Sequence, residues 1–359
     1  MRKLASVREV KKLIPIKGAD RIELAQVDGW FCIVKKGEFT TGDLGVYFEI
    51  DSLLPCKEPY LFLGKPKTYN GVDAYRIKTM KMRGVISQGL LLPTRYFKEL
   101  SDVSLGDDVT DILGITKYEA GNFNGNNGGS SKVSTSKGFP DFIPKTDQER
   151  IQNIPYVFEE MKDVQFEETL KLDGSSYTAY KIESNLPWYK RLINKVYPTF
   201  STTTFAVCSR NIELTSELDR PYEEMSNFYK VTVDNSVNVV LPVGYAIQGE
   251  LIAPNIQSNH EKVVKPELYI FDVFDIEKQK KLLPTQRREF VASIGLNHIP
   301  VINPNFTMFD SFNKLEDLLN HVEGESINPN TISEGRVYKS VDSDFSFKVI
   351  SNQYLLKER

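Results

Sequence analysis

A lysine followed by an aspartate and a glycine is the feature of this sequence that most clearly points to chemistry. Lys171, Asp173 and Gly174 lie between two runs of strand-forming residues, within the segment 166–183. A neutral lysine amine can attack the α-phosphate of ATP and keep AMP as a phosphoramidate. A free lysine has a pKa of about 10.4, so its surroundings must lower that pKa before it can attack. The alternative is an ordinary strand end with a turn.

Five more short motifs follow the lysine in order, and together they resemble the covalent nucleotidyltransferases. This superfamily contains ATP-dependent DNA ligases, RNA ligases and mRNA-capping guanylyltransferases. The matching residues are Lys171-Leu172-Asp173-Gly174, Ser209-Arg210-Asn211, Ile247-Gln248-Gly249-Glu250-Leu251, Tyr269-Ile270-Phe271-Asp272, Glu334-Gly335-Arg336-Val337 and Ser346-Phe347-Lys348-Val349. The resemblance implies three steps. Lys171 takes AMP from ATP, AMP passes to a 5′-phosphate, and a 3′-hydroxyl then displaces AMP.

The order of the domains narrows the resemblance to RNA ligases. Lys348 lies close to the final residue, Arg359, so we expect the additional domain to come first. That arrangement resembles the fifth RNA ligase family, which has an amino-terminal OB domain. Similar runs occur at 2–6, 18–23, 27–30, 145–147 and 150–153. One departure is Leu170, where other RNA ligases often carry a glutamate that reads the adenine amino group, so base selectivity must rest on another group.

Three acids are the predicted metal ligands. By their motif positions, Asp173, Glu250 and Glu334 would converge on a hydrated Mg²⁺ or Mn²⁺, since Mg²⁺ keeps several waters. The metal would help to lower the pKa of Lys171 and offset charge on the α-phosphate. A glutamate is most often a solvated surface charge, but its place in these motifs favours a functional role.

Four basic residues are expected to contact the phosphates and sugar of ATP. Lys348 is alone in the apolar run FSFKVI, so it must reach solvent or meet an anion, and we assign it to the α-phosphate. Arg210 is expected at the ribose or the terminal phosphates. By resemblance, Arg150 would also hold the nucleotide, although a helix-surface position is the alternative. Lys357 is expected to assist at the triphosphate, unless it is simply a solvated charge.

Phe271 is the predicted stacking platform for adenine. A planar aromatic face contributes roughly 1–3 kcal/mol per base without fixing its identity. Two alternatives stay open. The run LYIFDVF is apolar enough to be a buried strand, and Phe274-Asp275 repeats the aromatic–aspartate pair three residues later.

The elements that must position these residues fall into two domains. The stretch 121–138 is rich in Gly, Asn and Ser and indicates a linker, with a long surface loop as the alternative. Short strand patterns at 30–34, 44–50 and 85–93 favour an OB-type β-barrel over 1–120, for nucleic-acid binding, although other small barrels fit.

Residues 139–359 predict an α+β nucleotidyltransferase domain with antiparallel sheets, of the ATP-grasp-like ligase type. Expected helices are 147–162, 215–230, 284–294 and 311–322. Expected strands are 168–183, 203–208, 243–252, 267–275, 335–341 and 345–350.

Composition limits the function classes. The net charge of −3 excludes a polycation built for nucleic acid, so a binding surface must be local. The densest basic run is 76–83, where Arg76 and Lys78 would share one face and Lys81 and Arg83 the other. Three cysteines form no disulfide framework, and neither a secretory signal nor an apolar run of membrane-spanning length is present. We therefore expect a reduced, intracellular protein.

These observations predict an ATP-dependent RNA ligase that carries AMP on Lys171. It would join 3′-OH and 5′-phosphate ends, at nicks in duplexes with RNA on the 3′-OH side, as a monomer without membrane contact. The alternatives are the same chemistry on DNA, and a nucleic-acid-binding protein with a decayed site. The intact set of Lys171, Glu250, Glu334 and Lys348 argues against decay.

Overall fold

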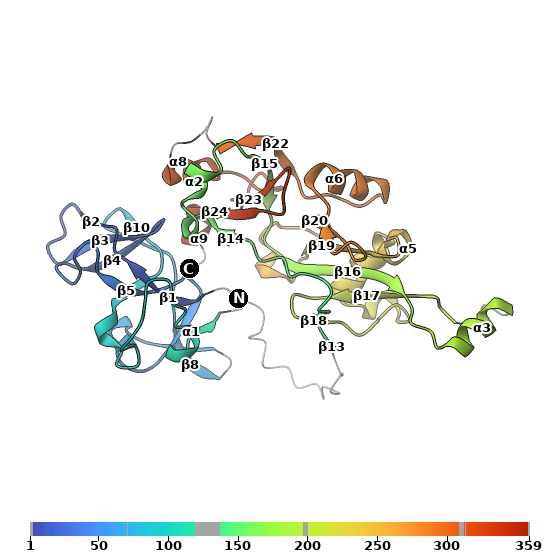
Figure 1. Ribbon diagram of the computed structural model, residues 1–359, viewed down its shortest axis with the longest axis horizontal. Helices are drawn as coiled ribbons and strands as arrows, with labels where there is room; N and C mark the ends of the chain where they lie inside the picture. Colours follow the sequence, from blue (N-terminus) through green and yellow to red (C-terminus); the bar gives the residue numbers. More distant parts are fainter. Residues whose placement is uncertain are drawn as a thin grey trace.

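The computed structural model describes residues 3–69, 71–118, 137–196, 200–308, 312 and 314–357. Figure 1 shows an amino-terminal β-rich unit, drawn in blue to cyan, beside a larger mixed unit drawn in green to red. Among the strands of these residues, pairing is antiparallel except between β14 and β24. In the described residues, no helix has the length and apolar character needed to cross a bilayer.

The amino-terminal unit is a barrel of short strands. β4 alternates buried and less buried side chains along WFCIVK, which is the pattern of a strand with one face toward a core. Its core includes Trp30 and Tyr47, whose rings stack at 5.7 Å. The strands are β1 (Ala5–Glu9), β2 (Lys12–Pro15), β3 (Ile22–Val27), β4 (Trp30–Lys35), β5 (Leu44–Phe48), β6 (Ser52–Pro55), β7 (Lys67–Tyr69), β8 (Val72–Arg76), β9 (Met80–Met82), β10 (Val85–Ser87), β11 (Leu90–Pro93) and β12 (Thr116–Lys117).

The larger unit contains two sheets, which are antiparallel apart from the β14–β24 pair. The strand order is β13-β18-β17-β16-β19-β20-β21 in the first and β14-β24-β23-β15-β22 in the second. These strands are β13 (Lys137–Gly138), β14 (Glu149–Arg150), β15 (Gln165–Lys171), β16 (Ser175–Glu183), β17 (Thr203–Cys208), β18 (Ile212–Glu213), β19 (Tyr245–Ile252), β20 (Glu267–Asp275), β21 (Lys280–Lys281), β22 (Val301–Thr307), β23 (Gly335–Ser340) and β24 (Ser346–Ile350).

Short helices connect and flank the sheets. In Figure 1, α6 lies beside β20, and α9 lies on the side of the larger unit that faces the barrel. The α-helices are α1 (Thr110–Leu113), α2 (Val157–Glu160), α3 (Trp188–Val196), α4 (Asn227–Asp234), α5 (Val237–Val240), α6 (Pro284–Ser293), α8 (Leu315–His321) and α9 (Asn352–Lys357). The 3₁₀ turns are η1 (Tyr60–Leu63), η2 (Thr94–Tyr96), η3 (Ile151–Asn153), η4 (Tyr222–Glu224) and η5 (Gln257–Asn259).

The strand predictions are largely confirmed, and two helix predictions are wrong over most of their length. Within 215–230 the structure has only the 3₁₀ turn η4 and, from Asn227, the start of α4. The strand predicted at 168–183 is interrupted at 172–174, between β15 and β16. Strands at 203–208 and 267–275 have the predicted bounds, and a helix occupies 284–293. The predicted helix at 147–162 is instead a two-residue strand, a 3₁₀ turn and one α-helical turn. Pro155 lacks the N–H that a continuous helix needs there. The single strand predicted at 85–93 is two strands, β10 and β11, which pair with different neighbours.

Residues 150–153 dock against the barrel instead of forming a helix. The Gly29 N–H donates to the Gln152 carbonyl at 2.9 Å, and the Trp30 indole N–H donates to the Asn153 side chain at 2.5 Å. The Asn153 amide in turn donates to Glu49 of the barrel at 2.9 Å. The similar runs at 27–30 and 150–153 are therefore two halves of one contact between the domains.

The domains also share apolar packing. Ile350, Tyr354 and Leu355 belong to the same buried cluster as barrel residues such as Val46 and Phe48. The predicted linker 121–138 lies outside the described residues, except for 137–138, which form β13. The predicted domain boundaries therefore stay a prediction.

Gly29→Ala tests this junction. An added Cβ would lie 2.7 Å from the Gln152 Cα and 2.6 Å from a Leu315 methyl, so the domains would have to separate. We expect a loss of about 1–3 kcal/mol in the free energy of unfolding, measured in guanidinium by tryptophan fluorescence. Gly138→Ala, where a Cβ meets nothing within 4 Å, should change it by less than about 0.5 kcal/mol. Equal effects of the two variants would contradict the close contact at Gly29.

Candidate active site

Lys171 ends β15 at the point where the chain crosses from one sheet to the other. The segment 172–174 leads directly into β16 of the seven-stranded sheet. The Lys171 Nζ donates to Glu334 Oε2 at 2.7 Å, and both side chains are mostly buried. Glu250 reaches the same place from β19, because Ser176 on β16 pairs with Glu250. The two sheets thus bring together residues that are far apart in sequence.

Two motif glycines make this gathering possible. A Cβ on Gly174 would lie 2.5 Å from the Leu251 carbonyl oxygen, so any other residue would push β19 and Glu250 away. Gly335 has a φ of +149°, and a Cβ there would collide with the Val349 carbonyl oxygen of β24. Both positions need the missing side chain of glycine. The glycines in the two motifs are therefore explained by close packing around Lys171.

The acids and the lysine determine one another's protonation. Burial alone would lower the pKa of Lys171, but Glu334, Glu250 and Asp173 together raise it above its usual value. Burial raises the pKa of Glu250 to about 8; Lys171 opposes this rise, and Glu334 and Asp173 add to it. Burial and Glu334 raise the pKa of Asp173 to about 7, against Tyr354 and Lys171. The raised pKa values show that the clustered carboxylates repel one another, and an added cation would relieve that repulsion.

The donor chemistry of this site fits a hydrated Mg²⁺ or Mn²⁺. All three predicted ligands offer carboxylate oxygens, which hard divalent cations prefer. In the described ranges, however, no three His, Cys, Asp or Glu side chains are close enough together to bind one ion directly. The arrangement fits an ion that keeps most of its waters and is held by Glu250, Glu334 and Asp173 partly through them.

Two of the predicted phosphate contacts, Lys348 and Arg210, interact with the same carboxylate, Asp147. Lys348 on β24 is paired with Arg150 of β14 and with Val337 of β23. Arg210 forms a two-pronged ion pair with Asp147, at 2.8 and 2.9 Å. Burial would raise the pKa of Asp147, but Arg210 and Lys348 lower it overall. Because Arg210 and Asp147 are about half exposed, phosphate oxygens can replace this carboxylate at little cost.

Arg150 and Lys357 lie differently from the other basic residues. Arg150 is buried, and its guanidinium carbon lies 5.7 Å from the centre of the Trp30 ring. The helix-surface alternative for Arg150 is therefore wrong. Lys357 is exposed at the end of α9, and its expected triphosphate contact stays a prediction.

Phe271 lies beside the lysine strand, and Phe274 does not. Phe271 is partly buried and packs against Leu170 and Leu172, which flank Lys171. Phe274 is buried in a separate cluster with Tyr180. Of the two phenylalanines, Phe271 is therefore the one that packs beside the segment containing Lys171. Leu170 is buried, so its side chain offers no group for reading a base.

Two neighbours of the site were missed by sequence reasoning. The Tyr354 hydroxyl donates to Asp173 at 2.7 Å, and Lys339 Nζ donates to the carbonyl of Phe271 and, at 2.6 Å, to Asp272. Lys339 lies in the strand GRVYKS, which also carries an arginine and a serine, so no sequence pattern marked it as buried. Tyr354 was not marked either, because an aromatic residue in a short terminal segment is usually core.

Comparison with known families assigns both halves of the chain. A family model described as an OB-fold domain matches residues 4–94. A model described as RNA ligase matches residues 164–350. The chain belongs to the RNA ligase family.

This RNA ligase is similar over its whole length to solved structures of Naegleria gruberi RNA ligase. The structure with pyrophosphate has 37% identity, a TM-score of 0.83 and full coverage of both chains. A glutamate-to-alanine variant with ATP and Mn has 36% identity and a TM-score of 0.83, and covers 100% of this chain and 99% of that one. A lysine-to-methionine variant with AMP and Mn has 36% identity, a TM-score of 0.83 and full coverage of both. Comparison with curated proteins gave no match.

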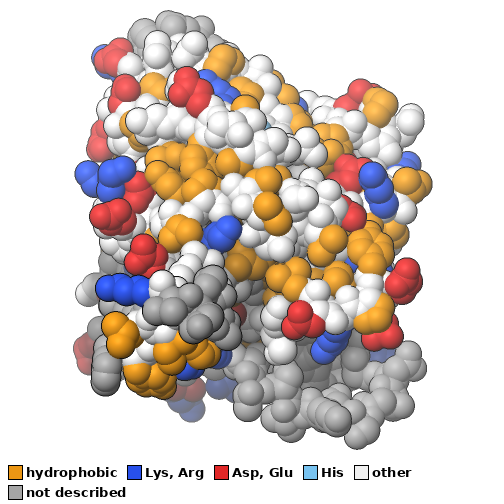
Figure 2. Space-filling view, turned by 90° about the vertical axis from the view of Figure 1, so that its right-hand side faces the viewer, with side chains coloured by type: hydrophobic (Ala, Val, Ile, Leu, Met, Phe, Trp, Pro, Cys, Tyr) orange, Lys and Arg blue, Asp and Glu red, His pale blue; other side chains and the backbone are white. Residues whose placement is uncertain are grey.

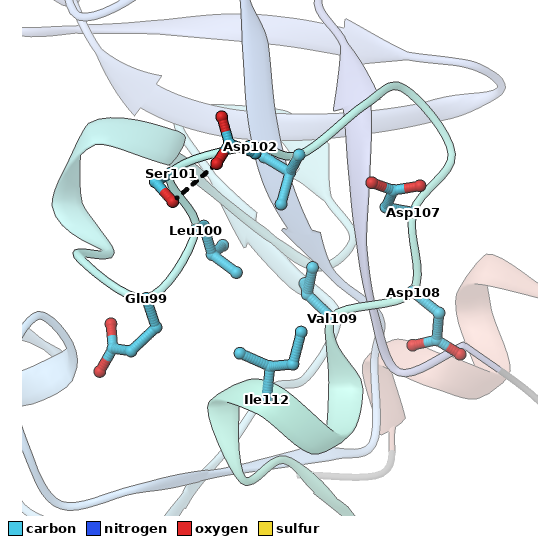
Figure 3. Close-up of a pocket in the computed structure, with 9 residues that line it drawn as sticks. Glu99, Leu100, Ser101, Asp102, Asp107, Asp108, Val109 and Ile112 are labelled. Carbon is cyan, nitrogen blue, oxygen red and sulfur yellow. Dashed lines mark hydrogen bonds between the residues drawn. The ribbon is translucent and has the colours of Figure 1, made fainter.

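A cavity elsewhere in the ligase does not suit a nucleotide. It has a volume of about 340 Å³ and lies in the OB-fold domain (Figure 3). Its lining includes the carboxylates of Glu99, Asp102, Asp107 and Asp108. Asp107 and Asp108 accept backbone N–H groups at 2.7 and 3.0 Å, so they stabilise turns. Phosphates would be repelled from this cavity.

Buried ion pairs fasten the two sheets of the ligase domain together. Asp272 on β20 faces Lys339 of β23 at 2.6 Å, Lys281 at 3.2 Å and Arg287 of α6 at 3.8 Å. Arg287 also pairs with Glu167 of β15. Burial alone would raise the pKa of Asp272, but Lys339, Lys281 and Arg287 hold it far below its usual range.

Asp272→Asn should destabilise the ligase by about 3–5 kcal/mol, because it leaves buried cations without their carboxylate. The folded pKa of Asp272 lies below the unfolded value of about 3.9. The stabilisation is therefore complete above that pH and is lost as the pH falls toward the folded pKa. Urea unfolding at several pH values measures this difference.

Asp275→Asn is the matched control on the same strand. Its partner Lys278 lies 2.8 Å away, and the Lys278 side chain is 73% exposed. The free energy of unfolding should therefore fall by only about 1 kcal/mol. An Asp272→Asn effect as small as this control would show that the network does not hold the sheets.

Proposed function

We propose that this protein is an ATP-dependent RNA ligase that joins RNA 3′-OH and 5′-phosphate ends at nicks in duplexes, through AMP held covalently on Lys171. The observation that carries the proposal is the Lys171 ammonium facing Glu334 at 2.7 Å beside Glu250 and Asp173. A decayed site would have no reason to keep buried acids around a lysine, since each costs desolvation energy.

The first step is an attack by Lys171 Nζ on the α-phosphorus of ATP. The N–P bond forms while the bond from the α-phosphorus to the pyrophosphate oxygen breaks, and pyrophosphate leaves. The ammonium must first lose a proton, and Glu334 is placed to receive it. Bound Mg²⁺ or Mn²⁺ would supply the positive charge that lowers the pKa of Lys171 and neutralises the α-phosphate. Glu250, Glu334 and Asp173 would hold that ion.

The remaining residues position the nucleotide. Phe271 stacks on adenine, next to Leu170 and Leu172. Lys348 contacts the α-phosphate, and Arg150 lies alongside it on β14. Arg210 releases Asp147 and binds the ribose or the terminal phosphates of ATP instead. Lys357 assists at the triphosphate. Since each step is a displacement at phosphorus, this positioning and charge neutralisation provide the catalysis.

The later steps move AMP onto the polynucleotide. An oxygen of the 5′-phosphate attacks the phosphorus of lysyl-AMP, the N–P bond breaks, and Lys171 takes up a proton. The 3′-hydroxyl then attacks the 5′-phosphate, and AMP leaves. The ligase acts as a monomer, with residues 1–120 as the nucleic-acid-binding domain, 121–138 as the linker and 139–359 as the nucleotidyltransferase domain.

Only part of the basic run 76–83 is available to RNA. Arg76 pairs with Asp51 at 2.6 Å and lies over the Tyr118 ring, so it stabilises the barrel. Lys81, between exposed Met80 and Met82, projects on the β9–β10 hairpin and can meet a phosphate. The face at the α3 end of the molecule lies opposite this hairpin. On that face, the Lys and Arg side chains of the described residues are scattered and form no continuous basic patch (Figure 2). These observations favour the β9–β10 side for RNA.

Lys171→Ala should abolish covalent labelling of the protein by α-labelled ATP with Mg²⁺ or Mn²⁺, because the variant lacks the amine that faces the three acids. Labelling is measured by denaturing gel in the absence of RNA. Lys280→Ala, an exposed lysine on β21, should label at the wild-type rate. If the Lys171→Ala protein still becomes labelled, Lys171 is not the nucleophile.

Joining assays on matched nicks separate RNA from DNA ligation. We expect sealing of a nicked duplex with ribose at the 3′-OH end to exceed sealing of its deoxyribose counterpart at least tenfold, a difference of about 1.4 kcal/mol in the barrier. Ends free in solution should join more slowly than a nick, since a duplex holds them together. Equal sealing of the two nicks would favour the DNA ligase alternative.

A further inference from the structure

The last helix contacts both domains at the nucleotide site. α9 begins after Ser351, whose N–H donates to the Glu334 carbonyl at 2.9 Å. Glu323 accepts the Asn352 N–H at 2.8 Å, which fixes the start of the helix. Two residues later, the Tyr354 hydroxyl donates to Asp173 at 2.7 Å. The helix α9 and the residue before it therefore contact the backbone of Glu334 and the carboxylate of Asp173.

The helix α9 also packs against the OB-fold domain. Tyr354 and Leu355 are 7% and 8% exposed and share a buried cluster with barrel residues. The buried Gln88, in the barrel, donates to the Asn352 side chain at 3.0 Å. Gln88 is itself held there, because its carbonyl accepts the Tyr47 hydroxyl at 3.2 Å. The OB-fold domain thus fixes the helix from which the Tyr354 hydroxyl reaches Asp173.

We propose that Tyr354 is a positioning residue through which the docked OB-fold domain sets the Asp173 carboxylate beside Lys171. This inference rests on the proposed lysyl-AMP function. Tyr354 is not a catalytic residue, because it acts on Lys171 only through Asp173. The ring is fixed on its other edge by His260, whose ring centre lies 5.1 Å away and whose Nε2 lies 2.7 Å from the Ile332 carbonyl oxygen.

The geometry assigns the OB-fold domain a part in the first chemical step, in addition to RNA binding. Asp173 interacts electrostatically with both Lys171 and Glu334. A carboxylate freed from its hydrogen bond can rotate, and the field at the lysine changes with it. Small displacements at a reacting centre cost large factors in rate, even when substrate binding is kept.

Tyr354→Phe is the decisive variant, because it removes only the hydroxyl and keeps the ring packing. We expect the rate of AMP transfer to Lys171 at saturating ATP to fall about tenfold, the scale of one hydrogen bond to a charged group. The ATP concentration at half-maximal rate should stay within about twofold, since the hydroxyl donates to Asp173, which is assigned to the metal.

Tyr177→Phe is the matched control. Its hydroxyl is also buried and bonded, to Thr232 at 2.8 Å, but it points away from the acids. Its labelling rate should stay within about twofold of wild type. Equal rates for Tyr354→Phe and Tyr177→Phe would overturn the proposal. So would an unchanged maximal rate with a raised ATP requirement, which would make Tyr354 a nucleotide contact instead.

A second pair of variants tests the link to the OB-fold domain. Asn352→Ala removes the acceptor of Gln88 and should slow AMP transfer about threefold, as a neutral hydrogen bond would. Gln353→Ala, at an exposed position on the same helix, should have no effect. If Asn352→Ala matches Gln353→Ala, the barrel does not act through α9.

Hydrogen–deuterium exchange decides the inference without any enzymatic turnover. In full-length Tyr354→Phe and Asn352→Ala, the amides of residues 171–175 should exchange about fivefold faster, while barrel amides stay protected. Unchanged exchange at 171–175 in both variants would overturn the proposal. A wild-type protein that forms no AMP adduct would refute the proposed function instead, and the exchange result would still report on Tyr354.

Discussion

Carboxylates gathered around a single ammonium repel one another, and the fold must hold them in place against that repulsion. Here Glu334, Glu250 and Asp173 face Lys171. In water such a cluster would separate, but each acid is fixed by a backbone that has little freedom to move. Asp173 lies in the crossover between the sheets, Glu250 lies near the end of β19, and Glu334 precedes β23.

The two sheets are kept in register by charges of a different kind. The network of Asp272, Lys339, Arg287 and Glu167 is buried, and its charges compensate one another. The site around Lys171 is partly exposed, and its carboxylates repel one another. This division is physically sensible, because compensated charges can be buried and rigid, whereas a site that must accept a cation and a triphosphate has to stay open and unbalanced.

The motifs predicted the residues of the site better than the contacts that hold those residues in place. Lys171, Glu250 and Glu334 were selected because their motifs occur in the expected order along the chain, whereas a single Lys-x-Asp-Gly motif could be an ordinary strand end. The helix at 147–162 was wrong because residues 150–153 bond to the barrel across the domains, and no local pattern contains that contact. Tyr354 was missed for the same reason. Its partner Asp173 is 181 residues away in the chain, so only the fold brings them together.

The shared core of the barrel and α9 has a consequence for synthesis. The barrel strands leave the ribosome before the ligase domain, and domains generally fold as units during translation. Here the cluster that contains Val46 and Phe48 also needs Ile350, Tyr354 and Leu355, which are made much later. The nascent barrel therefore has an unfilled apolar face until these residues have been made. A transcript that stops early would release a protein with this face open to water, which favours its aggregation and removal over the survival of a half-formed ligase.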